Sequence, residues 1–268
     1  AALGLADGSV IETVLLKPKP GDAWTVCISC QAGCAVGCTF CATGLMGLKR
    51  NLTVEEIVDQ VLFWVQYLKR GGVPGRVTNV VYMGMGEPFH CYELVAESLK
   101  ALTDPTRLGL AQRHIAVSTS GLAPGIARFA DDFPQVGLAL SLHAANDELR
   151  TRLGPVNKAY PLERLAKSLR VYLAKTNRRV FIEYVLLAGE NDSPKHADEL
   201  AAFVRKVASP HLLHVNLIVW NPTRTKHAPS PAADARAFRA RLEDAGLSVT
   251  IRKNLGQDVQ GACGQLIQ

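Results

Sequence analysis

The sequence predicts an α/β protein built as a partial barrel of parallel strands. Short runs rich in β-branched and aromatic residues alternate with longer amphipathic runs along the chain. Strands joined by single helices run parallel, because a right-handed crossover returns the chain to the same edge of the sheet. With 268 residues, 48% of them hydrophobic, the chain is long enough to bury one large core. Six consecutive strand–helix units are typical of a partial TIM-type barrel, a (β/α)6 arrangement.

Seven segments are predicted as strands and six as helices, in alternation. The strands are 24–29, 79–83, 114–118, 136–142, 180–187, 214–219 and 248–252, and the helices are 53–70, 91–102, 124–131, 161–175, 194–207 and 232–245. Thr53 and Glu56 have the spacing of a capping box, and Pro161 and Pro194 stand where a first helical turn tolerates proline. Residues 1–23, which include the strand-like IETVLL, are expected to form a strand or hairpin extension of the core, and residues 24–268 form the barrel and a C-terminal segment.

The composition indicates where the protein is expected to work and what kind of partner it could bind. No run of eighteen or more apolar residues is present, and the first ten residues lack the basic start and apolar centre of a secretory signal, so a cytoplasmic protein without a membrane span is expected. Thirty Lys and Arg against twenty-four Asp and Glu leave a net charge of +6, which suits a polyanionic partner without requiring one. The basic residues occur in short groups such as Lys49-Arg50 and Arg178-Arg179.

A cluster of cysteines follows the first predicted strand of the barrel. Five of the seven cysteines lie between positions 27 and 41, and Cys34, Cys38 and Cys41 have the spacing CxxxCxxC. A disulfide framework is not expected in a cytosolic chain with an ample core. Three thiolates can bind three corners of a 4Fe-4S cube and leave the fourth iron open. The alternative is a zinc site completed by Cys27, Cys30 or a histidine, although zinc sites more often use CxxC pairs.

The triplet, with the aromatic Phe40 before its last cysteine, resembles the radical S-adenosylmethionine (SAM) superfamily. Further segments resemble the RlmN/Cfr family of RNA adenine methyltransferases, and they occur in that family's order from about residue 11 to residue 266. These segments are CQAGCAVGCTFCATG, GLKRNLT, MGMGEP, STSG, SLHAANDELR, EYVLL, WNP and ACGQL.

The resemblance implies a cofactor site at the ends of the strands. Cys34, Cys38 and Cys41 would hold a 4Fe-4S cluster whose open iron is chelated by SAM, and two SAM molecules would be used per turnover. The residues implied to hold SAM are Gly86, Glu87, Ser118, Ser141, Leu142, His143 and Asn221. All of them lie at the end of a predicted strand or follow one, where barrels of this kind place their reactive groups.

The resemblance also implies three catalytic residues. Cys263 would carry a methyl group from the first SAM and link it to the adenine, and Cys27 would attack Cys263 in a transient disulfide-forming step that releases the product. Glu12 would accept the ring proton. Cys30 and Cys91 match no residue of known role in the family, and we expect both to be buried structural thiols.

The implied reaction is methylation of carbon 2 of an adenosine in 23S rRNA, and of an adenosine beside the anticodon of tRNA. Basic loops such as Lys49-Arg50 and Arg178-Arg179 are expected to hold RNA phosphates. An electron donor such as flavodoxin and a monomeric state are expected. Relatives usually carry a further N-terminal helical domain, which is expected to be absent here.

Three alternatives stay open at this point. The first is methylation of carbon 8, as in the Cfr type. The second is a radical SAM enzyme with a substrate other than RNA. The third is a zinc-stabilised RNA-binding module without catalysis, which would leave the GEP, SLH and WNP segments at strand ends without a use.

Overall fold

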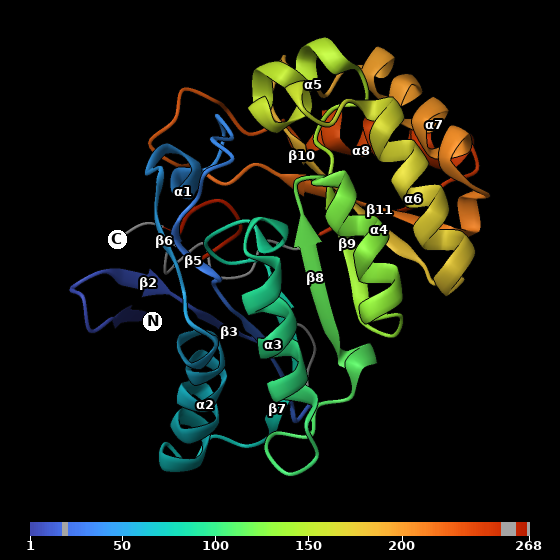
Figure 1. Ribbon diagram of the computed structural model, residues 1–268. Coiled ribbons are helices and arrows are strands. Elements are labelled where there is room, and N and C mark those ends of the chain that lie inside the picture. The colour runs from blue at the N-terminus through green and yellow to red at the C-terminus, as the bar shows by residue number, and fades with distance from the viewer. Residues whose placement is uncertain (18–20, 253–260, 267–268) are drawn as a thin grey trace.

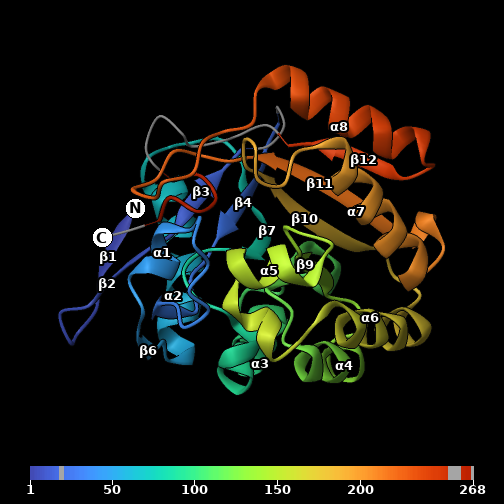
Figure 2. The same cartoon turned by 90° about the horizontal axis from the view of Figure 1, so that it is seen from above.

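A single curved sheet forms the centre of the molecule. The computed structural model describes residues 1–17, 21–252 and 261–266 (Figure 1). The sheet has eight strands in the order β12-β11-β10-β9-β8-β7-β4-β3. Their bounds are β3 Val14–Leu16, β4 Ala23–Cys27, β7 Arg76–Tyr82, β8 Ile115–Thr119, β9 Gly137–Ser141, β10 Val180–Leu186, β11 Leu213–Val219 and β12 Ser248–Ile251. Viewed from above, the strands follow an arc with the helices outside it (Figure 2).

The strand directions confirm the predicted fold class. Strands β4 to β12 of this sheet pair in parallel, and only β3 runs antiparallel, against β4 at the edge. Each of the seven predicted strands is present, with bounds shifted by at most three residues. The sheet is therefore a partial barrel with an additional antiparallel edge strand.

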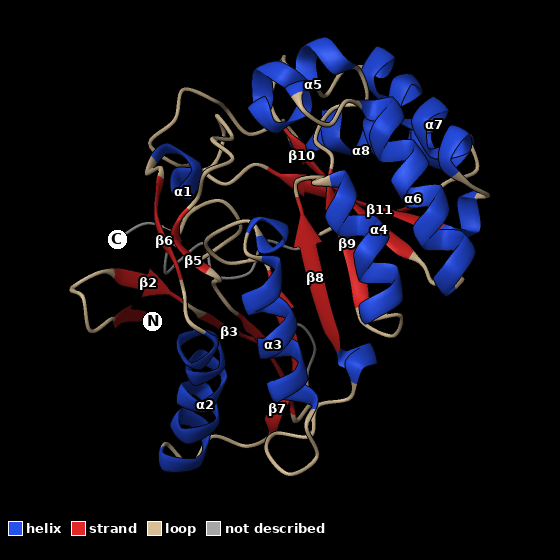
Figure 3. Cartoon of the chain, in the orientation of Figure 1, coloured by secondary structure: helices blue, strands red, loops and turns tan. Residues whose placement is uncertain are grey.

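Six helices cover the outer face of the sheet (Figure 3). They are α2 Val54–Arg70, α3 Tyr92–Thr103, α4 Ala123–Asp132, α6 Leu162–Thr176, α7 Pro194–Val207 and α8 Ala232–Asp244, each within one residue of its predicted bounds. Pro161 is the N-cap of α6 and lies just before its first turn, a correction of one position. Among the helices that the structure describes, none combines the length and hydropathy of a membrane span.

Helix α2 shows how the sequence produces these elements. Ile57, Val61, Trp64 and Leu68 are spaced by three and four residues, so their side chains lie on one face and are buried against the sheet. The predicted capping box is present: Glu56 N donates to Thr53 Oγ1 at 3.2 Å, and Thr53 N donates to the Glu56 carboxylate at 2.9 Å.

Within residues 1–23, which were expected to form a strand or hairpin extension, strands β1 Ala2–Gly4 and β2 Val10–Glu12 form an antiparallel hairpin. Several other short elements were not predicted. Strands β5 Gln31–Gly33 and β6 Leu48–Asn51 form a second antiparallel hairpin. Short helices α1 Ala42–Leu45 and α5 Asp147–Leu153 follow β5 and β9 in the chain. The four 3-10 turns are η1 Pro88–His90, η2 Gln112–His114, η3 Pro155–Lys158 and η4 Pro210–Leu212.

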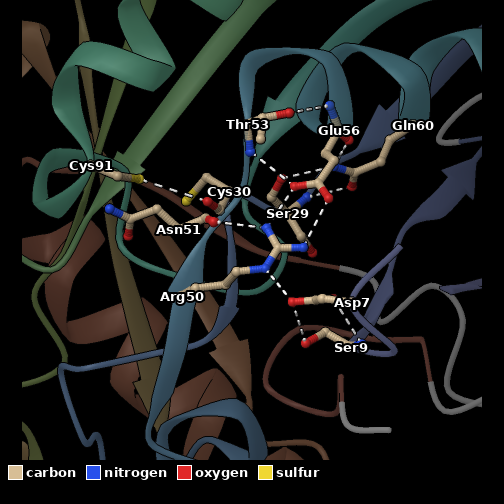
Figure 4. Close-up of polar contacts among 10 residues, drawn as sticks. All are labelled: Asp7, Ser9, Ser29, Cys30, Arg50, Asn51, Thr53, Glu56, Gln60 and Cys91. Carbon is tan, nitrogen blue, oxygen red and sulfur yellow. Dashed lines mark hydrogen bonds and ion pairs between the residues drawn. The ribbon is translucent and has the colours of Figure 1, made fainter. Parts of the chain in front are cut away.

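A polar network attaches the β5–β6 hairpin and the end of β4 to helix α2 (Figure 4). The fully buried Gln60 accepts from Ser29 N and donates to Ser29 O, both at 2.8 Å. Arg50 forms ion pairs with Asp7 at 2.6 Å and Glu56 at 2.7 Å. Arg50 was expected to hold RNA phosphates, but the structure already matches its charge with two carboxylates.

Candidate active site

A cavity opens at the carboxyl ends of the parallel strands, where the barrel architecture predicts the reactive groups. Most of the residues named from the sequence line this cavity together: Cys34, Cys38, Cys41, Gly86, Glu87, Ser118, Ser141, His143 and Cys263. Leu142 lines a small adjoining cavity beside Cys38, and Asn221 lines a second adjoining cavity beside Cys27. Segments from all along the chain thus meet at one edge of the sheet.

The loop that carries the cysteine triplet is held in place by backbone contacts. Thr39 N donates to Leu153 O at 2.9 Å, and Trp220 Nε1 donates to Phe40 O at 2.9 Å. A side chain at Gly33 is excluded, because its Cβ would lie 1.9 Å from the carbonyl oxygen of Gly47 and its φ is +82°. The triplet is therefore fixed between the β5–β6 hairpin, the end of α5 and the end of β11.

An apolar cluster surrounds the same loop. It consists of Phe40, Ala144, Leu149, Leu153, Val185, Leu187 and Trp220, with Cys38 and Cys41 packed against it. Burial raises the pKa of Cys34 to about 12 and also raises the pKa values of Cys38 and Cys41. Metal binding removes these thiol protons, since the thiolate is the ligand.

The donor set fits an iron–sulfur cluster better than a single zinc ion. All three thiols of the triplet reach one cavity. No three His, Cys, Asp or Glu side chains in the described part of the chain are grouped closely enough to hold one metal ion. A zinc site needs its ligands around one centre, whereas the thiolates of a cube bind different irons and stand farther apart.

Glu87 is a buried carboxylate in the wall of the cavity, 3% exposed. It accepts hydrogen bonds from Thr119 Oγ1 and Ser120 N, both at 2.7 Å, and from Phe89 N at 3.1 Å. Burial raises its pKa, and these hydrogen bonds oppose the rise because they favour the carboxylate. A fixed acceptor in this position can bind an ammonium group.

His143 has an unusual backbone and a defined tautomer. Its φ is +60°, and Asn191 Nδ2 donates to its carbonyl at 2.8 Å. Its Nδ1 accepts from Val185 N at 3.1 Å, so the proton of the neutral ring is on Nε2. Burial, reinforced by the positive charge of Arg150, lowers its pKa to about 3. His143 is therefore a neutral hydrogen-bond donor at physiological pH.

Cys27 and Cys263 line one adjoining cavity together with Arg252 and Asn221. Asn221 Nδ2 donates to Cys263 O at 3.0 Å, and Ala42 N donates to Gly264 O at 2.9 Å, so the segment 261–266 is docked beside α1. Cys263 also lines the main cavity, as do Arg252, Met83 and Ile218, and it is the one cysteine that lines both. All seven cysteines are free thiols, so no permanent disulfide is present.

The two thiols differ in their surroundings. Cys27, at the end of β4, is buried, and burial raises its pKa to about 12, with a smaller contribution from Cys263. Cys263 is an exposed residue, but its thiol lies among enough protein atoms that burial raises its pKa, while Arg252 opposes the rise. Reagent access depends on the exposed surface, and by that measure Cys263 is the more accessible thiol.

Glu12 lies on β2, apart from the residues that line the main cavity. Its backbone carbonyl accepts from Ser29 Oγ at 2.6 Å, and its backbone N lies 3.4 Å from Met85 Sδ. The described contacts therefore place Glu12 next to the segments that carry Cys27 and Gly86.

Besides Arg252, which lines both cavities, two charged residues of the site were missed in the sequence. Glu183 is 4% exposed, accepts from Asn216 Nδ2 at 2.9 Å and pairs with Arg252 at 3.2 Å. Arg150 on α5 is 3% exposed and shares the small adjoining cavity with Cys38. Both lie in segments that carry the family resemblance, EYVLL and SLHAANDELR, which was the only sequence signal for them.

Comparisons with known proteins agree with this geometry. The sequence profile of the radical SAM superfamily matches residues 28–201. A protein of Moorella thermoacetica called a probable dual-specificity RNA methyltransferase RlmN is 46% identical over 98% of this chain and 74% of its own length. A protein of Chloroflexus aurantiacus with the same description is 46% identical over 99% of this chain and 72% of its own length.

A solved structure is similar over almost the whole chain. The crystal structure of a radical SAM methyltransferase from Sphaerobacter thermophilus superimposes with a TM-score of 0.93 and 46% identity, covering 99% of this chain and 76% of that one. The fold, the cysteine loop and the relatives lead to the same conclusion. The chain belongs to the radical SAM superfamily and, within it, to the RlmN family of RNA methyltransferases.

Proposed function

We propose that this radical SAM RNA methyltransferase methylates carbon 2 of an adenosine in 23S rRNA and of an adenosine beside the anticodon of tRNA. The observation that carries the proposed route through a methylated cysteine is the position of Cys263, which lines both the cavity of the cysteine triplet and the cavity of Cys27. The choice of carbon 2 is supported by the similarity to relatives described as RlmN. One thiol is thereby placed to meet a cofactor on one side and a second thiol on the other.

In the proposed site, Cys34, Cys38 and Cys41 bind a 4Fe-4S cluster through three of its irons. The cluster and SAM, when bound, supply radical chemistry at an adenine carbon, and two SAM molecules are used per turnover. Gly86, Glu87, Ser118, Ser141, Leu142, His143 and Asn221 hold SAM. Glu87 would accept a hydrogen bond from its amino group, and His143 would donate one from Nε2.

The chain's own residues then complete the transfer. Cys263 would carry the methyl group, give one of its hydrogen atoms to the radical that SAM supplies, and join the remaining carbon to the adenine. Glu12 would remove the ring proton, and the electron left over would return to the cluster. Cys27 attacks the sulfur of Cys263, so an S–S bond forms as the S–C bond breaks. The electron pair remains on the carbon, which takes a proton to become the methyl group.

RNA and an electron donor are the proposed partners of the enzyme. Arg178 and Arg179 are the proposed phosphate contacts, because the charge of Arg50 is already matched by Asp7 and Glu56. They precede β10 and lie at the edge of the sheet opposite the cavity, so the phosphates that they bind are distant from the reacting adenine. An electron donor of the flavodoxin type reduces the cluster, and the enzyme works as a cytoplasmic monomer.

An anaerobic reaction tests the proposal. Reconstituted protein is incubated with methyl-labelled SAM and fragments of 23S rRNA or tRNA, and the nucleosides are read by mass spectrometry. We expect 2-methyladenosine. Exclusive formation of 8-methyladenosine would overturn the assignment of the carbon, and 5'-deoxyadenosine without methylated RNA would overturn the assignment of the substrate.

Two cysteine variants test the roles of the thiols. Cys263→Ala abolishes methylation, whereas Cys91→Ala, which alters a buried thiol outside both cavities, retains it. Cys27→Ala leaves RNA attached to Cys263, which is visible as a protein–RNA band on a denaturing gel. A Cys263→Ala enzyme that still produced 2-methyladenosine would exclude the mechanism.

A further inference from the structure

Arg150 is a buried cation with neutral hydrogen-bond partners. Its guanidinium donates to Asn157 Oδ1 and to the carbonyl of Ser120, both at 2.6 Å, and to the carbonyl of Tyr160 at 3.3 Å. Within the described residues, its Nε has no hydrogen-bond partner and no carboxylate lies within ion-pairing distance. A buried charge of this kind is costly unless an opposite charge compensates it.

The neighbouring acids compensate the charge only in part. Asp147 is exposed and reaches Arg150 through Asn157, whose Nδ2 donates to Asp147 Oδ1 at 3.0 Å. Glu87 is buried but lies on the other side of Ser120, whose N–H donates to Glu87 while its carbonyl accepts from Arg150. His143, a further titratable neighbour, is neutral. Arg150 itself stays charged at physiological pH, because burial lowers its pKa only to about 10.

The position of Arg150 relative to the cysteine loop indicates what compensates it. Arg150 and Cys38 line the same small cavity, together with Leu153 and Gly154. A Cβ built at Gly154 would lie 3.7 Å from Cys38 Sγ, so no side chain intervenes at that position. Arg150 therefore lies beside the loop that carries the cysteine triplet and shares a small cavity with Cys38.

We infer that Arg150 is the counter-ion of the cluster held by Cys34, Cys38 and Cys41, and that it sets the reduction potential of that cluster. This inference rests on the cluster ligation in the proposed function. Thiolate ligands make the bound cluster anionic, and the electron added on reduction makes it more so. A nearby buried cation stabilises the reduced form more than the oxidised form and raises the potential.

Arg150 acts through the cluster, so it is a positioning residue. A purely structural role, in which it only joins Ser120, Asn157 and Tyr160, would not depend on its charge. The two roles separate in Arg150→Gln, which keeps hydrogen-bond donors and loses the cation, and in Arg150→Lys, which keeps the cation.

The experiment is a redox titration of the reconstituted cluster, followed by electron paramagnetic resonance without SAM or RNA. We expect a midpoint potential more negative than wild type in Arg150→Gln and close to wild type in Arg150→Lys. Arg152→Gln removes an exposed charge from the same helix and should leave the potential unchanged. Equal potentials in Arg150→Gln and wild type would overturn the inference.

If Arg150→Gln does not fold, the variant Asp147→Asn tests the same inference. Asp147→Asn removes the nearest opposing carboxylate, and an amide oxygen can still accept from Leu162 N and Asn157. We expect a shift of the opposite sign, to a less negative potential, and an unchanged potential in this variant counts against the inference. A wild-type protein that bound no 4Fe-4S cluster would instead refute the proposed function itself.

Discussion

Replacing Gln60 by alanine removes the side chain that satisfies both backbone polar groups of Ser29. The amide of Gln60 accepts from Ser29 N and donates to Ser29 O, and it also donates to Glu56 O at 3.1 Å. The residue is fully buried, so water does not replace the lost contacts. Ser29 Oγ in turn accepts from Met85 N and donates to the carbonyl of Glu12. Gln60 therefore helps to hold the segments that carry Glu12 and Met85.

The expected loss of stability follows from this geometry. Each buried polar group left without a partner costs about 1–3 kcal/mol. Gln60→Ala leaves two such groups, the N–H and the carbonyl of Ser29. We therefore expect the free energy of unfolding to fall by about 4 kcal/mol. For a domain of this size, that corresponds to a fall in Tm of roughly 8–16 °C.

Urea denaturation followed by circular dichroism measures the change. The matched control is Gln66→Ala, which removes an exposed glutamine from the same helix and should change the free energy by less than about 0.5 kcal/mol. Gln60→Met fills the space without hydrogen-bonding and should be nearly as destabilising as Gln60→Ala. If Gln60→Ala lost no more stability than Gln66→Ala, the reasoning from unsatisfied buried groups would be refuted.

Two further predictions concern the cysteines. Gly33→Ala forces a Cβ against the carbonyl of Gly47 at a positive φ, so the cysteine loop must shift. We expect less iron bound per chain after reconstitution than in the control Gly8→Ala, where no atom lies within 4 Å of the added Cβ, and equal iron contents would contradict the prediction. Burial raises the pKa of Cys27 to about 12 from an unfolded value near 8.5, so its contribution to stability is full below about pH 8.5 and is lost as the pH rises toward 12. Between pH 8 and 9.5, the free energy of unfolding of the reduced, cluster-free wild type should fall by about 1 kcal/mol more than that of Cys27→Ala. Urea denaturation at each pH measures both values. Parallel pH profiles of the two proteins would exclude a buried neutral thiol at position 27.

The regular elements were predictable because their signals are local. The apolar spacing in α2, its capping box and the alternation of strands with helices are properties of neighbouring residues. The short elements were missed because their stability comes from distant contacts. The hairpin β5–β6, for example, depends on Gly33 passing close to Gly47 and on Arg50 pairing with Asp7, neither of which appears in a local pattern.

Only the residues of the candidate site that lie in recognisable sequence motifs were predicted. The spacing of Cys34, Cys38 and Cys41 indicated the cluster chemistry, and the family resemblance brought in Cys27 and Cys263. The charges around them were not predictable. Arg150 is an ordinary basic residue in the sequence of a short helix, and only the tertiary structure places it, buried, beside the loop that carries Cys38.

The docking of segment 261–266 beside α1 has a consequence for the order in which the protein assembles. Thr43 Oγ1 donates to Leu266 O at 2.7 Å across 223 positions of sequence, so almost the whole barrel separates the two partners along the chain. Closing so long a loop requires the intervening strands to be in place first, because they bring its ends together. A chain still emerging from the ribosome can form the cysteine-triplet loop well before position 263 has been synthesised. We therefore expect Cys27 and Cys263 to be brought together last, when the C-terminal segment docks on the completed barrel.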